Sequence, residues 1–177
     1  MNDLIDETLA KAIDIAETAS KIPMTYFRKP LTLVEKEDES PVTIADRETE
    51  MFIRERLAEA FPLDGIFGEE FGVQEGGNDA LWIIDPIDGT SNFLRGVPVW
   101  ATLISLAIDG IPVIGVVSAP ALGKRWWGSK GNGAWVDESR DPLANVPIPE
   151  ELSEYLEQPM VAVAEPRKLE VSGVKDL

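Results

Sequence analysis

Hydrophobic residues recur at helical spacing in the first third of the chain, and the pattern predicts two helices. Between residues 3 and 22 the apolar positions lie three or four apart with charges on the opposite face, and Pro23 is expected to close the run. A second helix is expected after Thr43, which lies three residues before Asp46 in an arrangement close to a capping box, and Pro62 is expected to end it. The buried face of this second helix is marked by Phe52, Ile53, Leu57 and Phe61.

The hydrophobic period changes after the second helix. Residues 81–84 form a short, continuous apolar run, which is typical of a buried strand. Residues 97–108 and 111–118 are apolar and β-branched, and the Asp109-Gly110 step between them is a strong signal for a hairpin. Helices followed by a meander of strands favour an α+β layered architecture over alternating βαβ units.

The last part of the chain carries weaker signals. A second turn, within residues 130–133, is expected to join two more strands. Residues 137–158 contain three prolines and many acids, which indicates a boundary or a surface loop, and residues 160–164 read as one new strand. We therefore expect an N-terminal α+β metal- and phosphate-binding domain over residues 1–140. Residues 141–177 would be an acidic, proline-containing loop and the first strand of a truncated C-terminal α/β domain.

Composition narrows the possible chemistry. The 177 residues include 16 Lys and Arg against 32 Asp and Glu, a net charge of -16, and there is neither Cys nor His. Such acidity argues against nucleic acid or an anionic membrane as a partner, and the missing residue types exclude thiolate nucleophiles and Ser-His-Asp triads. Catalysis must therefore rest on carboxylates, hydroxyls, amides and hard metal ions. The N-terminus is unlike a signal peptide and the apolar runs are short, so we predict a cytoplasmic protein.

Two carboxylates stand where the first predicted strand ends. The proline after Asp85 keeps that residue extended, and Asp88 follows across a tight turn, with the Ile87 carbonyl between the two acids. Gly89 and Thr90 come next, at an expected helix start whose backbone N–H groups suit a phosphate. Hard oxygen ligands beside an anion site are what Mg²⁺ and a phosphate require.

Two more acids are candidates for the same site, and each of these features has a purely structural alternative. Glu69 follows a short apolar stretch and would otherwise be part of a solvated acidic loop, while Asp46 would otherwise be a capping acid. The Asp-Gly step would otherwise be a simple turn, with Thr90 as a helix cap. If Glu69 and Asp46 converge with the acid pair, the crowded charge must raise carboxyl pKa values or bind cations. Two or more Mg²⁺ ions that clamp a phosphate are the simplest resolution.

Taken together, these motifs resemble the inositol-monophosphatase-like family of Mg²⁺-dependent phosphatases. The stretches that carry the likeness are Gly68-Glu69-Glu70, residues 82–93 and residues 36–46. Within this family, the sequence is most similar to histidinol-phosphate phosphatases, particularly the actinobacterial ones. That similarity lies in residues 40–47, 95–104 and 115–127.

The resemblance implies a role for each candidate residue. The Mg²⁺ ligands that it implies are Glu69, Asp85, the carbonyl of Ile87, and Asp88. The phosphate ligands that it implies are Asp88, Gly89 and Thr90. Two or three ions would share the site, the first held by the first three ligands and the second by the aspartate pair. Thr90, hydrogen-bonded to Asp46, would orient and deprotonate the metal-bound water, with Glu69 assisting.

The resemblance also implies a fold, an activity and partners. The fold would be a layered α/β sandwich with helices on a mostly antiparallel sheet. We expect the second α/β domain to be largely missing, together with a further Asp ligand that family members carry in a Trp-Asp-x-Ala-Ala-like segment. The implied reaction converts L-histidinol phosphate to L-histidinol and phosphate, and the implied assembly is a homodimer. An inositol-1-phosphate or related sugar-phosphate phosphatase, and a non-catalytic metal- or phosphate-binding fragment, remain alternatives.

Overall fold

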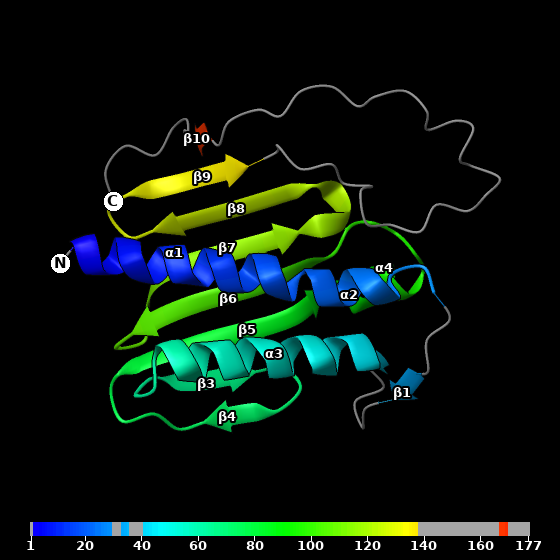
Figure 1. The fold of residues 1–177 in the computed structure, drawn as a ribbon, viewed down its shortest axis with the longest axis horizontal. Helices are drawn as coiled ribbons and strands as arrows, with labels where there is room; N and C mark the ends of the chain where they lie inside the picture. The colour runs from blue at the N-terminus through cyan, green and yellow to red at the C-terminus, as the bar shows by residue number, and fades with distance from the viewer. Residues whose placement is uncertain (1, 30–32, 36–40, 138–166, 170–177) are drawn as a thin grey trace.

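The elements of the computed structural model form two layers, helices on one face of a sheet (Figure 1). The structure describes residues 2–29, 33–35, 41–137 and 167–169. The helices that cover the sheet are α1 (Asn2–Ala19), α2 (Lys21–Tyr26) and α3 (Ile44–Ala60). Two short helical elements, α4 (Thr90–Leu94) and the 3-10 turn η1 (Pro120–Leu122), lie between strands. The expected class, helices layered on a mainly antiparallel sheet, is confirmed.

The described strands form one mixed sheet of eight strands and one small antiparallel pair. The order in the main sheet is β10-β9-β8-β7-β6-β5-β3-β4, and every neighbouring pair is antiparallel except β3 and β5. Its strands are β3 (Gly65–Gly68), β4 (Gly72–Gln74), β5 (Ala80–Asp88), β6 (Ala101–Ile108), β7 (Ile111–Ala119), β8 (Lys124–Ser129), β9 (Gly133–Asp137) and β10 (Arg167–Leu169). The small pair is β1 (Leu33–Glu35) with β2 (Pro41–Thr43).

The predicted hairpins are present in the structure. Asp109 and Gly110 have φ angles of 52° and 74°, so both adopt the left-handed conformation that a tight two-residue turn requires. Ile108 and Ile111 pair directly across this turn. The second predicted turn joins β8 to β9. Local turn chemistry therefore sets the register of the antiparallel half of the sheet.

Two predicted boundaries are wrong for identifiable reasons. Pro23 does not end the first helical run, because the helix is interrupted at Ser20. Pro23 then lies in the first turn of α2, where backbone N–H groups have no partner within the helix and the missing N–H of proline costs nothing. The strand expected from residue 97 begins at Ala101. Pro98 has no N–H to donate to a neighbouring strand, and the Val99 carbonyl accepts a hydrogen bond from the Asn92 side chain. The strand expected at residues 160–164 lies outside the described residues.

The main hydrophobic core lies between α1, α3 and the sheet. Ala12, Ala16 and Ala19 are fully buried, and these small side chains let the backbone of α1 approach the strands closely. Trp82 of β5 is also fully buried, and its Nε1 donates a hydrogen bond to Asp64 at 2.9 Å. Satisfying the one polar group of this large side chain makes its burial favourable.

A second, aromatic core lies where α2, α3 and β5 meet. The rings of Phe27, Phe93 and Trp100 pack with centroids 5.0–5.6 Å apart, and the side chains of Ala45 and Ile87 are buried in the same cluster. Trp100 is only 3% exposed and belongs to this core. Since Ala45 and Ile87 each precede a candidate acid in the sequence, this core brings the start of α3 to the end of β5.

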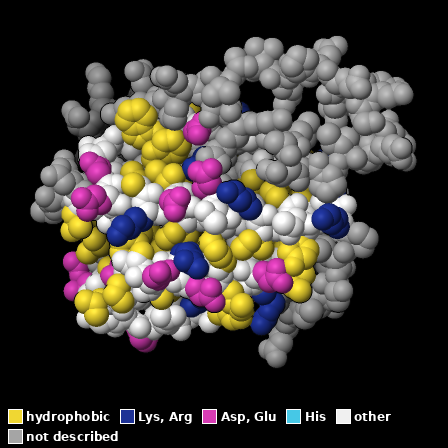
Figure 2. Space-filling model, in the orientation of Figure 1, with side chains coloured by type: hydrophobic (Ala, Val, Ile, Leu, Met, Phe, Trp, Pro, Cys, Tyr) yellow, Lys and Arg dark blue, Asp and Glu magenta, His cyan; other side chains and the backbone are white. Residues whose placement is uncertain are grey.

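The outer face of the helices is a mixed surface. Figure 2 shows Asp and Glu side chains scattered among Lys, Arg and hydrophobic groups over α1 and α3, and they do not gather in one patch. In the part of the chain that the structure describes, no helix is both long and apolar enough to cross a bilayer.

Two isoleucines of β6 provide a test of the main core. Ile104 is 1% exposed and Ile108 is 40% exposed. Ile104→Ala should lower the free energy of unfolding by about 2–5 kcal/mol, because it leaves a cavity under the helices. Ile108→Ala, the matched control, should cost about 1 kcal/mol or less. Urea denaturation followed by circular dichroism measures both, and equal losses would contradict the placement of the core.

Candidate active site

The end of β5 is irregular, and this irregularity turns its acids toward the edge of the sheet. Between Asp85 and Asp88 the register with β6 shifts, so that three steps along β5 match two along β6. Such a bulge suits Pro86, which has no N–H to donate, and the Pro86 carbonyl instead accepts a 2.8 Å hydrogen bond from the buried hydroxyl of Thr102. The result is that Ile87 points into the aromatic core while Asp88 is exposed.

Parallel pairing brings a third acid to the same edge. Gly68 of β3 pairs with Ile84 of β5, so the next residues along the two strands are Glu69 and Asp85. Parallel neighbours end at the same edge of a sheet, and the two carboxylates therefore emerge beside each other. Glu69 itself is exposed in the turn between β3 and β4.

The structure brings all four predicted acids into one electrostatic cluster. Burial, as the largest cause, raises the pKa of Asp85 together with the charges of Glu69, Asp88 and Asp46 and a hydrogen bond to Glu69, from 3.8 to about 7 in all. Asp46 is only 1% exposed in the first turn of α3. Because acids from α3, β5 and the β3–β4 turn all act on Asp85, the convergence expected from the sequence is present.

Gly89 allows the chain to turn sharply after the last of these acids. Its φ is +86°, and a Cβ at this position would lie 3.1 Å from the Val99 carbonyl oxygen. α4 begins immediately afterwards, and the amides of Asn92 and Phe93 bond back to the Gly89 carbonyl. The first N–H groups of a helix have no partner within it, so the start of α4 presents donors beside the acid cluster.

Thr90 has a local role in the structure. Its hydroxyl lies 3.0 Å from the Ile87 carbonyl and donates a hydrogen bond to it, whereas the resemblance implied a bond between Thr90 and Asp46. A carbonyl oxygen has two lone pairs, so the bond from Thr90 uses only one of the two acceptor positions of Ile87. Thr90 and Ile87 thus lie together at the end of β5, and the roles that the resemblance implied for them stay predictions.

Comparison with known proteins identifies the relatives of this arrangement. The sequence profile described as "Inositol monophosphatase family" matches residues 4–172. The chain belongs to this family. Histidinol-phosphatases from Mycobacterium tuberculosis and Chlorobaculum parvum are 47% and 44% identical, over 76% and 74% of this chain and 53% and 51% of their own. The Thermotoga maritima IMPase structure superposes with a TM-score of 0.67 at 33% identity, covering 72% of this chain and 50% of that one. The chain spans about half the length of the relatives that it matches.

The acid cluster suits the cation chemistry expected of this family. Carboxylates and a carbonyl are the hard oxygen ligands that Mg²⁺ prefers. Asp85 Oδ1 is buried and has no hydrogen-bond partner, which is costly for a carboxylate unless a cation or a proton compensates. Among the residues described, no three acids are grouped closely enough to hold one ion, and Asp85 instead shares a hydrogen bond with Glu69. The residues therefore fit a divalent cation in chemistry and in charge, although they do not form a closed shell.

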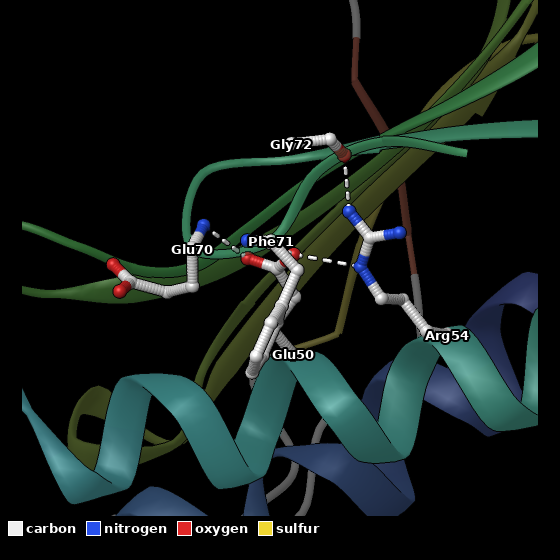
Figure 3. Close-up of polar contacts among 5 residues, drawn as sticks. All are labelled: Glu50, Arg54, Glu70, Phe71 and Gly72. Atoms are coloured by element: carbon white, nitrogen blue, oxygen red, sulfur yellow. Dashed lines mark hydrogen bonds and ion pairs between the residues drawn. The ribbon is translucent and has the colours of Figure 1, made fainter.

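One buried acid that binds the backbone next to Glu69 could not be recognised from the sequence. Glu50 of α3 is fully buried, and its carboxylate accepts hydrogen bonds from the backbone N–H groups of Glu70 and Phe71, at 2.6 and 3.1 Å (Figure 3). It also pairs with Arg54 at 2.8 Å. An acid four residues before an arginine on a predicted helix was visible in the sequence, but that pattern usually marks an exposed surface pair. Lys36, the first residue of the stretch 36–46 that carries part of the family likeness, lies outside the described residues.

The raised pKa of Asp85 predicts how the stability of the metal-free chain depends on pH. The folded state holds a proton on Asp85 between about pH 4 and 7, where the unfolded state has released it, so the stability that Asp85 contributes should fall as pH rises through this range. Asp85→Asn should flatten this part of the profile. Urea midpoints measured with a chelator at about pH 5 and about pH 8 compare the two chains, and an identical slope would contradict the cluster.

Proposed function

We propose that this cluster acts in the Mg²⁺-dependent hydrolysis of a phosphate monoester, and that the substrate is L-histidinol phosphate. The observation that carries the reaction class is the convergence of Glu69, Asp88 and Asp46 on Asp85, whose buried Oδ1 has no partner. The substrate proposal rests on the two relatives named histidinol-phosphatase, at 47% and 44% identity.

The metal would be held at the end of β5. Glu69, Asp85 and the carbonyl of Ile87 would bind one Mg²⁺, and Asp85 with Asp88 would bind a second. Two or three ions would neutralise the four carboxylates. When bound, Mg²⁺ supplies charge neutralisation at the phosphoryl group and activation of the attacking water.

The substrate phosphate would lie against the turn into α4. Gly89 brings backbone N–H groups to this position, and Asp88, Gly89 and Thr90 would be its contacts. A dianionic phosphate is favoured there by N–H donors that have no partner within the helix. Positioning of this kind is the main protein contribution to phosphoryl transfer, because little covalent chemistry is required.

Proton handling would fall to carboxylates and a hydroxyl, since the chain has no histidine. Asp46 is buried beside the cluster, and its carboxylate would orient Thr90 and help it to accept a proton from the attacking water. Glu69 is exposed in its turn and would assist. In this proposal the Thr90 hydroxyl exchanges its bond to the Ile87 carbonyl for one to Asp46 when the site is loaded.

Neither the assembly nor the location of the protein is tested by these observations. The homodimer, the cytoplasmic location and the division at residue 140 stay predictions. Phosphate esters of inositol or sugars are the competing substrates, and a non-catalytic metal-binding role is the competing function; the experiment below includes each as an outcome.

Phosphate release from histidinol phosphate tests the proposal. We expect release that requires Mg²⁺, stops when a chelator is added and exceeds release from inositol-1-phosphate. Asp85→Asn and Asp88→Asn should each lower the rate by roughly 100-fold, because each removes a ligand. Asp109→Asn is the matched control: it makes the same chemical change in the β6–β7 turn and should leave the rate unchanged.

Thermal unfolding with and without Mg²⁺ separates the alternatives. Stabilisation by Mg²⁺ that Asp85→Asn abolishes, without turnover of any ester, would support the non-catalytic role and overturn the proposed reaction. Faster release from inositol-1-phosphate would overturn only the substrate. The absence of both stabilisation and turnover would overturn the metal site itself.

A further inference from the structure

A buried ion pair on α3 holds the backbone just beyond Glu69 (Figure 3). The two carboxylate oxygens of Glu50 receive the N–H groups of Glu70 and Phe71, and Arg54 donates a hydrogen bond to the carbonyl of Gly72. One acid and one base, a single helical turn apart, therefore bind three consecutive residues of the β3–β4 turn.

The same carboxylate packs against the residue that precedes Glu69. A Cβ on Gly68 would overlap Oε1 and Cδ of Glu50, and it would lie 2.9 Å from Nη2 of Arg54. Only glycine leaves room for the Glu50 carboxylate at this position. The buried side chain of Glu50 therefore contacts the backbone on both sides of Glu69.

The chemistry of this clamp suits positioning better than packing. Glu50 is fully buried, and a buried ion pair is rarely more stabilising than apolar side chains of the same size. Hydrogen bonds from N–H groups to a carboxylate are, however, short and directional, and they fix the backbone that carries the donors. The guanidinium groups of Arg47 and Arg54 also lie 4.8 and 6.0 Å from the centre of the Phe71 ring, so α3 makes a further contact with the turn.

One face of α3 thus serves the site in two ways. Asp46 and Glu50 are four residues apart, and both are buried on the side that faces the sheet. Asp46 acts on Asp85 directly through its charge. Glu50 lies next to the turn that carries Glu69, the acid that hydrogen-bonds to Asp85.

We propose that Glu50 is a positioning residue: by clamping residues 68–72 it holds the Glu69 carboxylate beside Asp85, where Glu69 can serve as a cation ligand. This inference rests on the proposed function, because it assigns Glu69 to the metal site. It makes α3 the common support of two acids that approach the site from different elements.

The test uses Glu50→Gln in the 177-residue chain, because glutamine keeps the size of the side chain but presents an NH₂ group to one of the N–H donors. Titration calorimetry with Mg²⁺ should give a roughly tenfold lower affinity than for the unmodified chain. Hydrogen exchange of the Glu70 and Phe71 amides should become faster. Glu55→Gln, an exposed acid on the same helix, is the matched control and should change neither quantity.

A variant that is destabilised elsewhere separates positioning from general loss of stability. Ile114→Val removes a methyl group from the main core, far along the sheet from the turn, and should leave the Mg²⁺ affinity unchanged at a temperature where the chain is folded. If Glu50→Gln is unfolded by circular dichroism, Arg54→Lys replaces it. That variant keeps the charge pair but loses the fork that spans Glu50 and Gly72, and it should shift both readouts in the same direction.

Two negative results have different meanings. In the first, the unmodified chain binds Mg²⁺ and Asp85→Asn abolishes the binding, but Glu50→Gln binds Mg²⁺ as tightly as Glu55→Gln. The positioning role is then wrong and the proposed function stands. If the unmodified chain binds no Mg²⁺, the metal site is wrong and this inference fails with it. Equal loss of affinity in Ile114→Val would also overturn the positioning role.

Discussion

Mutual repulsion among carboxylates at the end of β5 is the constraint on which the rest of the site depends. Like charges separate in water unless something holds them together, and here the chain brings them together from three separate elements. Burial and the neighbouring charges of Glu69, Asp88 and Asp46 together raise the pKa of Asp85, so its charged form is disfavoured in this arrangement. Holding the carboxylates together requires rigid contacts next to each acid, and packing and hydrogen bonds among the described residues provide these contacts.

The support comes from packing and from buried polar contacts. The aromatic cluster of Phe27, Phe93 and Trp100 fixes the start of α3 against the bulge of β5. Thr102 binds the carbonyl inside that bulge, and Glu50 binds the turn after β3. These supports are connected, because α3 carries Asp46, packs in the aromatic cluster and provides Glu50.

Features that depend on neighbouring residues could be predicted from the sequence, and features that depend on distant contacts could not. The Asp109-Gly110 hairpin and the Asp85–Asp88 pair are local, and both appear where the pattern placed them. The helix break at Ser20 is not marked by a residue that disfavours helix, so the hydrophobic periodicity predicted one continuous helix across it. Glu50 looked like an ordinary surface acid, because its partners lie about 20 residues away in the turn after β3. Nothing local distinguishes a buried acid from an exposed one until the sheet is assembled.

The contacts of the sheet also differ in how far apart along the chain the contacting residues lie. Strands β6 to β9 pair with their immediate neighbours in sequence, so each pairing closes only a short loop. The edge that carries the acids needs the parallel pairing of β3 with β5 and also the docking of α3 on β5, and this docking joins residues much further apart along the chain. We therefore expect the meander to form first during folding, so that the like charges come together only in the last step, on a surface that is already rigid.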